Sequence, residues 1–304
     1  MFASAVHATA VKGFSAEAAA LYNAGRPTYS NDALDRVFEV LYSRFPEREN
    51  STIVELGAGT GKFTSAFLSY SKSKSVLDSY PAVQRMKYIA TEPSDGFRAS
   101  LKEILSAEHA NVEIGSATGS SIPQPDKSVD GVVVAQAFHW MATTDTLKEV
   151  HRVLAPQSPL VLVWNTYDYS FDWLRQIDAQ VLSKAYAPDV PRQQNGKWQD
   201  CFNTDTGRDL FSMVHKWQGR YVQAGDADMI VGRVMSTSVV VEKTPQEKVE
   251  IEKIVRNIIA THPELEEARK TKRFEISYIT ELAWVNSNIS PASGHNFDTG
   301  AFAR

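Results

Sequence analysis

The chain has 304 residues, and its 36 acidic and 32 basic side chains give a formal net charge of −4. Hydrophobic residues make up 43% and charged residues 22%, which is typical of a globular protein with a sizeable core. No run of Lys and Arg marks a nucleic-acid-binding face, and no apolar run approaches the roughly 18 residues that span a bilayer. The single cysteine, Cys201, excludes an internal disulfide, and the start of the chain lacks a signal-peptide pattern. The sequence therefore predicts a cytoplasmic protein that binds neither membrane nor nucleic acid.

Residues 14–46 have a helical pattern, and alternating strand-like and helix-like segments follow up to residue 165. Short apolar segments that predict strands lie at 52–58, 86–92, 111–117, 128–138 and 159–165, and helices are predicted at 62–71, 96–105 and 144–154. The polar stretch 71–85 is expected to be a surface excursion. Strands separated by helices of this length indicate a parallel sheet with right-handed crossovers.

Beyond residue 165 the pattern is more mixed. Helices are predicted at 171–186 and 245–264, strands at 215–224 and 272–285, and a disordered tail over the polar residues 286–304. The chain thus divides into an N-terminal helical lid (1–50), a ligand-binding core (51–165), C-terminal strands with a helical insertion that complete the same domain (166–285), and the tail (286–304).

The glycine-rich segment "ELGAGTG" at residues 55–61 allows three interpretations. A P-loop needs Lys followed by Ser or Thr, but Lys62 is followed by Phe63. A dinucleotide fingerprint needs a third small residue where this chain has Lys62. The third pattern, ExGxGxG, suits a ligand that carries a carboxylate and an amino group beside a nucleoside, with Glu55 accepting a hydrogen bond from the amino group. The alternative is that the glycines only form a tight turn.

The ends of the later strands agree with the ligand-binding interpretation. Glu92 ends the second predicted strand, where a carboxylate can accept hydrogen bonds from both hydroxyls of a ribose. An exposed loop acid is the alternative. The third strand ends near Ala117, where an adenine edge would lie, and the fourth ends in "AQAFHW". All these loops share the carboxyl edge of the predicted sheet, which is where doubly wound folds bind ligands.

Together these segments resemble the class I S-adenosylmethionine-dependent methyltransferases, in particular the methyltransferase type 11-like enzymes of the trans-aconitate branch. The resemblance rests on "FSAEAAALYNAGRPTYS", "VELGAGTGKFT", "ATEPS", "IPQPDKSVDGVVVAQAFHW" and "HRVLAPQSPLVLVWN", and more weakly on "GRVMSTSVV" and "FEISYITELAWV". It covers residues 14–285 and is specific over 14–165. It implies an α/β fold with a Rossmann-like, doubly wound, mostly parallel seven-stranded sheet, an N-terminal helical lid and a C-terminal helical insertion. The implied cofactor is S-adenosylmethionine, and the implied reaction is methyl transfer to a small molecule.

The resemblance also implies roles for individual residues. The cofactor-binding residues are Tyr22, Arg26, Glu55, Gly57, Ala58, Gly59, Glu92, Pro93, Ala117 and Gln136. The glycine loop would hold the amino-acid end of the cofactor, Glu92 the ribose, Ala117 would lie beside the adenine, and Gln136 near the reacting methyl. Tyr22 and Arg26 would close over the cofactor, with Arg26 pairing with its carboxylate. Two departures are the lack of an acid near Ser116 or Thr118 and the turn Pro156-Gln-Ser-Pro159 in place of Pro-Gly-Gly.

Methyl transfer from a sulfonium needs alignment in a dry pocket and no metal, and no metal-ligand cluster is visible in the sequence. His139 is the candidate general base, with a packing role as the alternative. Residues that are candidates to contact the acceptor are Tyr29, Trp140, Trp164, Tyr167 and Arg233, although such aromatic residues also form cores. The resemblance, Arg26 and Arg233 favour a small anionic acceptor, methylated on a carboxylate oxygen.

Two other functions remain open from the sequence, a non-catalytic S-adenosylmethionine-binding protein and, less favoured, a nicotinamide-dependent oxidoreductase. A monomer or a homodimer is expected.

Overall fold

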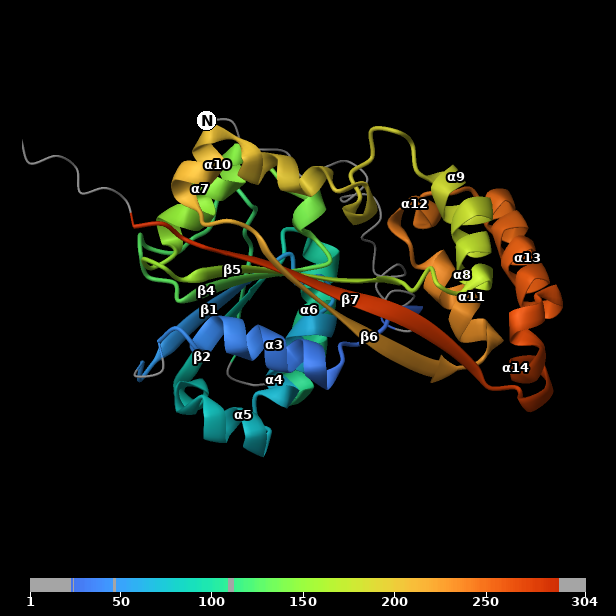
Figure 1. The fold of residues 1–304 in the computed structure, drawn as a ribbon, viewed down its shortest axis with the longest axis horizontal. Coiled ribbons are helices and arrows are strands. Elements are labelled where there is room, and N and C mark those ends of the chain that lie inside the picture. Colours follow the sequence, from blue (N-terminus) through green and yellow to red (C-terminus); the bar gives the residue numbers. More distant parts are fainter. Residues whose placement is uncertain (1–22, 24, 46–47, 109–111, 290–304) are drawn as a thin grey trace, which may run out of the picture.

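The computed structural model describes residues 23, 25–45, 48–108 and 112–289. Its centre is a seven-stranded sheet with helices on both faces, and a further group of helices gathers beyond one end of the sheet (Figure 1). The strands are β1 (Ser51–Leu56), β2 (Met86–Thr91), β3 (Glu113–Gly115), β4 (Gly131–Ala135), β5 (Pro159–Tyr167), β6 (His215–Gly225) and β7 (Phe274–Asn286).

The strand order is β3-β2-β1-β4-β5-β7-β6. Strands β1 to β5 are parallel, whereas β7 runs antiparallel to both β5 and β6. The predicted doubly wound, mostly parallel, seven-stranded sheet is therefore confirmed. Because the chain order reverses between β1 and β4, the loops that follow these two strands diverge and leave room for a ligand at the carboxyl edge.

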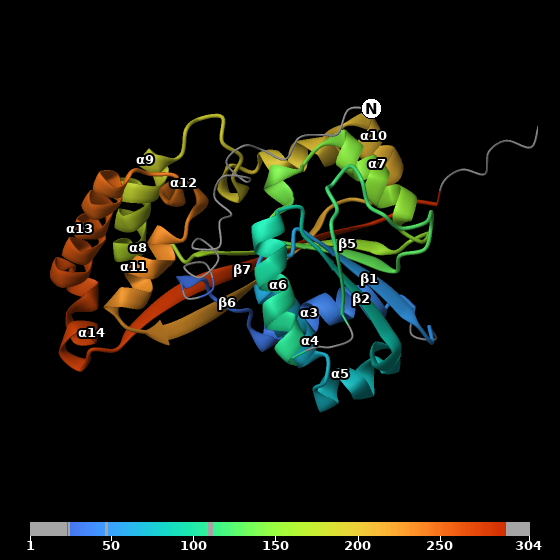
Figure 2. The ribbon, with the colours of Figure 1, turned by 180° about the vertical axis from the view of Figure 1, so that it is seen from behind.

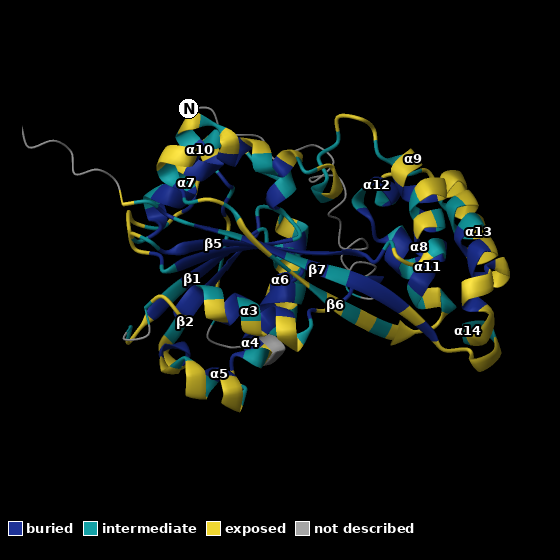
Figure 3. Ribbon diagram, viewed as in Figure 1, coloured by how far each residue is buried: buried dark blue, intermediate teal, exposed yellow. Residues whose placement is uncertain are grey.

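Helices cover the two faces of the sheet in the order that the crossovers require. One face carries α3 (Asn31–Tyr42), α4 (Lys62–Tyr70) and α6 (Asp95–Glu108), and the other carries α7 (Thr144–Val153) and α10 (Asp205–Leu210), as both views show (Figures 1 and 2). Central strands are buried on both faces, while the edge strand β6 is partly or fully exposed along its length (Figure 3).

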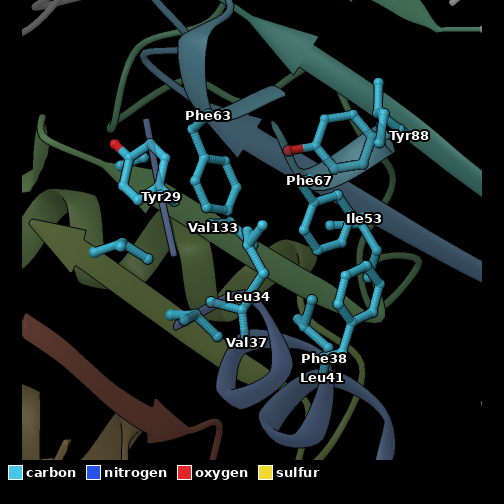
Figure 4. Packing of buried hydrophobic residues seen from close by; sticks show 14 of the residues in the cluster. Tyr29, Leu34, Val37, Phe38, Leu41, Ile53, Phe63, Phe67, Tyr88 and Val133 are labelled. Carbon is cyan, nitrogen blue, oxygen red and sulfur yellow. The ribbon is translucent and has the colours of Figure 1, made fainter. Parts of the chain in front are cut away.

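Aromatic packing attaches α3 to the sheet. The Phe38 ring stacks on Phe67 with centroids 4.4 Å apart, and Tyr29, just before α3, meets Phe63 edge-on at 5.0 Å (Figure 4). Ser30 caps the helix by accepting a hydrogen bond from the backbone N–H of Ala33. The segment before α3 is thereby held beside the carboxyl edge of the sheet.

The helical insertion is confirmed, and β6 divides it into two parts. The first part holds α8 (Asp172–Ile177), the π-helical turn η3 (Asp178–Leu182), α9 (Ser183–Ala185), two 3₁₀ turns, η4 (Gln193–Asn195) and η5 (Lys197–Asn203), and α10. The second holds α11 (Ala227–Met235), α12 (Ser238–Val241), α13 (Pro245–Thr261), η6 (Pro263–Leu265) and α14 (Glu266–Thr271). Figure 1 shows α8, α9 and α11 to α14 gathered at one end of the molecule.

Several boundaries differ from the predictions. The stretch 71–85, expected as a surface excursion, forms α5 (Lys74–Ser79) and η1 (Pro81–Arg85) and buries Val76 and Val83. The fourth strand ends at Ala135 rather than 138, because Gln136 takes a φ of 60° and η2 (Phe138–Trp140) follows. Residues 26–30 are not helical, since Pro27 disfavours helical backbone in the residue before it.

At the C-terminal end, Asn286 still belongs to β7, and the backbone N–H of Ser287 donates to the carbonyl of Ser158. The prediction of a disordered tail from residue 286 is therefore wrong for Asn286 and Ser287. Residues 290–304 and most of the predicted N-terminal lid lie outside the described residues. Within the described part of the chain, no helix is long and apolar enough to cross a membrane.

Candidate active site

A cavity of about 400 Å³ lies at the carboxyl edge of the sheet. Its walls combine the ends of β1, β2, β4 and β5 with residues of the helical insertion. It brings together the site residues predicted from the sequence, namely Arg26, Tyr29, Glu55, Gly57, Ala58, Gly59, Glu92, Pro93, Ala117, Gln136, His139, Trp140, Trp164, Tyr167 and Arg233. Tyr22 lies outside the described residues. Strand ends, lid and insertion, which are far apart in the sequence, thus meet around one space.

The glycine loop after β1 needs its glycines. Gly57 and Gly59 have φ values of 69° and 59°, a left-handed conformation that side chains with a Cβ disfavour. A Cβ at Gly57 would lie 3.0 Å from the Cβ of Ala137, whereas a Cβ at Gly59 would meet protein only at 3.8 Å, on Phe97. Gly59 therefore faces space rather than neighbouring protein, and that space is the cavity.

Glu92 holds this loop in place and faces the same cavity. Its Oε2 accepts a hydrogen bond from the Gly59 N–H at 2.9 Å, and its Oε1 accepts one from the Ser94 N–H at 2.8 Å. Only 4% of the residue is exposed, so the alternative of an exposed loop acid is wrong. Burial raises the pKa of Glu92, although these two hydrogen bonds act in the opposite direction. Each carboxylate oxygen can accept a further hydrogen bond, which fits a pair of ribose hydroxyls.

Glu55 is fully buried at the end of β1. Its Oε2 accepts hydrogen bonds from the Thr64 hydroxyl at 2.6 Å and the Tyr88 hydroxyl at 2.8 Å, and its Oε1 has no hydrogen-bond partner in the described part of the chain. Burial, with a smaller contribution from the nearby Glu92, raises the pKa of Glu55 to about 7. A buried acidic oxygen without a partner at the cavity wall fits a ligand that carries an ammonium group.

The raised pKa of Glu55 makes stability depend on pH. In the folded protein the proton is held more tightly than at the ordinary value of 4.5, so stability present at low pH is lost as the pH rises through about 7. We expect the wild type to lose about 2 kcal/mol of unfolding free energy between about pH 5.5 and about pH 8 from this group. Urea denaturation at the two pH values measures this loss.

Glu55→Gln should lose less unfolding free energy than the wild type over this pH range, because the amide does not titrate. Glu113→Gln serves as the control, because the Glu113 side chain is 53% exposed, and it should lose as much unfolding free energy as the wild type. An equal decline in the Glu55→Gln variant would contradict the assignment.

His139 lies in η2, beside the end of β5. The indole Nε1 of Trp164 donates a hydrogen bond to Nδ1 of His139 at 3.4 Å, and Trp164 itself is 1% exposed. Burial, together with the positive charge of Arg26, lowers the pKa of His139 to about 3. A general base must become a cation during the reaction, so this environment disfavours the predicted role of His139 as a base.

Asn23 and residues 25–30, here called the strap, contact the cavity wall both beside the glycine loop and at the insertion. On the side of the glycine loop, the Lys62 ammonium donates to the Asn23 carbonyl at 2.7 Å, and the Thr60 hydroxyl donates to the Asn23 side chain. On the side of the insertion, the Arg26 guanidinium donates to the Ser236 carbonyl at 3.0 Å and to its hydroxyl at 3.2 Å. The sequence did not predict these contacts, nor Lys62 as a residue of the cavity wall.

Residues of the insertion form the far end of the cavity. Arg233 is 6% exposed, with its guanidinium 4.9 Å from the Tyr167 ring centroid, so it is not a helix-surface arginine. Asp178 accepts hydrogen bonds from the Tyr169 hydroxyl at 3.1 Å and the Ser183 hydroxyl at 2.7 Å. Tyr169, Asp178 and Ser183 line the cavity but were missed, because no local sequence pattern marks them.

Across the described residues, no group of three or more His, Cys, Asp or Glu side chains is arranged to hold a metal ion. The acidic residues of the cavity are instead bonded to backbone N–H groups and hydroxyls.

Residues 54–162 match a family model described as a methyltransferase domain. An uncharacterized methyltransferase-like protein of Schizosaccharomyces pombe is 34% identical over 182 residues, which are 60% of this chain and 62% of that protein. An uncharacterized methyltransferase of Mycobacterium bovis is 29% identical over 244 residues, which are 80% of this chain and 84% of that protein. The crystal structure of the YcgJ protein of Bacillus subtilis shares the fold, with a TM-score of 0.51 and 15% identity over 86% of this chain and 100% of that one.

The matched segment runs from β1 to β5 and contains the glycine loop, Glu92, Gln136 and His139. The chain spans 62% and 56% of the lengths of two methyltransferase relatives from Schizosaccharomyces pombe. The ExGxGxG loop and the strand-end carboxylate of Glu92 both lie within the segment that matches the family model. Residues 54–162, which run from β1 to β5, are therefore similar to a methyltransferase domain.

Proposed function

We propose that this chain binds S-adenosylmethionine in the cavity and transfers its methyl group to a small molecule bound at the insertion end. The observation that carries the proposal is the continuity of the cavity, from the glycine loop and Glu92 at one end to Arg233 and Tyr167 at the other. A cofactor bound by the loop would thus point its reactive end toward residues that the methyltransferase domain itself does not supply.

The cofactor would bring an already activated methyl group, so the protein has to bind, orient and exclude water. Glu92 would accept hydrogen bonds from the ribose hydroxyls, and Glu55 would face the ammonium group of the cofactor. Tyr29 and Trp164 are both buried and would close the walls around the reacting atoms. Arg26, held at Ser236, would face the carboxylate of the cofactor.

For the acceptor, we propose a small anion that is methylated on a carboxylate oxygen, in line with the resemblance to the trans-aconitate branch. A carboxylate is ionised at neutral pH and needs no general base, which agrees with the low pKa of His139. The buried guanidinium of Arg233 would hold a second anionic group of such an acceptor and orient the first.

A transfer assay with methyl-labelled cofactor tests the proposal. Fractionated metabolites and a set of di- and tricarboxylates, including trans-aconitate, serve as acceptors, and a carboxylate product should release volatile methanol in mild alkali. A labelled product that is stable to alkali would contradict carboxylate methylation. Tight cofactor binding without transfer to any fraction would favour a non-catalytic binding protein instead.

Arg233→Met should raise the acceptor KM about tenfold or more, because a charge-assisted hydrogen bond is lost. Binding of S-adenosylhomocysteine to this variant, measured by calorimetry, checks that its fold is intact. The matched control is Arg175→Met, since Arg175 is 51% exposed and ion-paired with Asp172 on α8. An unchanged KM in the Arg233→Met variant would remove Arg233 from the acceptor site.

A further inference from the structure

The hydrogen bond between Trp164 and His139 determines where the imidazole carries its proton. The indole N–H can only donate, so Nδ1 of His139 must be the acceptor of the 3.4 Å contact. In a neutral imidazole the proton then resides on Nε2. Trp164 is 1% exposed and belongs to the buried strand β5, so the donor is held in place by the sheet.

The other ring nitrogen, Nε2, belongs to a side chain that lines the cavity, and it is not among the fully buried polar atoms that lack a partner. His139 is half-buried and lines the cavity, and no described residue forms a hydrogen bond with Nε2. Gln136, which follows β4, and Trp140, whose ring centroid is 5.0 Å from that of His139, also line the cavity. A ligand bound there would meet an N–H group rather than a lone pair.

The charges around the ring keep it neutral. Among the described residues, the charged group that bears on His139 is Arg26 of the strap, and the residue that bonds to it from β5 is the uncharged Trp164. Burial and this positive charge both oppose protonation, and they lower the pKa of His139 to about 3. The imidazole is therefore neutral throughout the physiological range.

We propose that Trp164 fixes His139 in the neutral tautomer with the proton on Nε2, and that this N–H donates a hydrogen bond to an oxygen of the methyl acceptor. The inference rests on the proposed function for the existence of that acceptor. Trp164 is then a positioning residue, and His139 is a donor instead of a base. Because His139 then removes no proton, the oxygen that receives the methyl group must already be unprotonated when the acceptor binds, as a carboxylate oxygen is.

Nitrogen-15 NMR of protein labelled at its histidines tests the tautomer without any acceptor. The His139 signals, assigned by their absence from the His139→Gln variant, should show an unprotonated Nδ1 and a protonated Nε2. They should not change between about pH 5 and about pH 8, because the pKa lies near 3. Titration of the ring within that range, or a proton on Nδ1, would overturn the proposal.

Trp164→Phe keeps an aromatic ring but removes the donor, and it should shift the His139 signals toward a mixture of tautomers. Trp198→Phe is the matched control, because the Trp198 ring packs 4.9 Å from that of Trp164 and forms no hydrogen bond with His139 among the described residues. If both variants leave the signals unchanged, or both change them equally, Trp164 does not set the tautomer.

The role as donor is tested by kinetics with the acceptor found in the transfer assay. His139→Ala should raise the acceptor KM about tenfold, and His139→Gln, which keeps an N–H donor, should recover part of the loss with no change in pH profile. If the kcat of His139→Gln is as low as that of His139→Ala, and a pH-dependent limb of the rate profile is lost, His139 acts as a base. Failure to bind S-adenosylhomocysteine would contradict the proposed function but would not affect the tautomer result.

Discussion

Replacing Gly59 by arginine is expected to abolish cofactor binding. Position 59 has a φ of 59°, and a Cβ built there is 3.8 Å from the protein atom nearest to it, so a long side chain at this position extends into the cavity. We expect the affinity for S-adenosylhomocysteine to fall at least about 1,000-fold, which corresponds to about 4 kcal/mol. Isothermal calorimetry measures this loss directly.

Gly59→Ala is the matched control for backbone strain. It imposes the same left-handed conformation on a residue with a Cβ, at a cost on the order of 1–2 kcal/mol, but it adds only a methyl group. The alanine variant should therefore be destabilised like the arginine variant and still bind the cofactor. Retention of tight binding by Gly59→Arg would place the cofactor elsewhere.

Replacing Glu92 by alanine is expected to weaken cofactor binding at least about 100-fold, or about 3 kcal/mol, because hydrogen bonds to a charged group contribute about 1.5–3 kcal/mol each. The effect has two physical sources. The carboxylate would lose its bonds to the ribose, and the Gly59 N–H would lose the partner that now holds it at 2.9 Å. Calorimetry with S-adenosylhomocysteine checks the affinity.

Glu92→Gln should also bind poorly, since its amide N–H₂ would face the N–H of Gly59 or of Ser94, which now donate to the two carboxylate oxygens. Asp95→Ala is the control, because Asp95 is also acidic and close in sequence but its side chain is 93% exposed. Equal affinity of the wild type and the Glu92→Ala variant would show that Glu92 does not contribute to cofactor binding.

The cofactor end of the cavity could be predicted because its chemistry is local in the sequence. Gly57, Gly59 and Glu92 follow strands directly, and parallel strands bring their ends to one edge of the sheet. The positive φ values of the glycines and the burial of Glu92 give the physical reason for those residue types. The parallel part of the sheet follows from the alternation of strands and helices, whereas the seven-stranded, doubly wound arrangement was implied by the resemblance.

The contacts of the insertion could not be predicted in the same way. Arg26 bonds to Ser236 across 210 residues, and Asp178 joins Tyr169 and Ser183 inside an irregular run of short helices. No periodicity marks such contacts, because they arise only when the insertion packs on the strap and β5. The polar stretch 71–85 misled for a related reason, since few apolar residues, among them Val76 and Val83, suffice to hold α5 and η1 against the core.

The most direct test of the account is whether the protein binds S-adenosylhomocysteine in preference to a nicotinamide dinucleotide. A ligand that binds only the folded state stabilises it by about 2.7 kcal/mol at about a hundredfold excess over Kd, which raises the melting temperature. The account predicts that S-adenosylmethionine and S-adenosylhomocysteine raise the melting temperature of the wild type, that the Gly59→Arg variant does not respond, and that NAD has no effect. A shift with NAD and none with S-adenosylhomocysteine would contradict it.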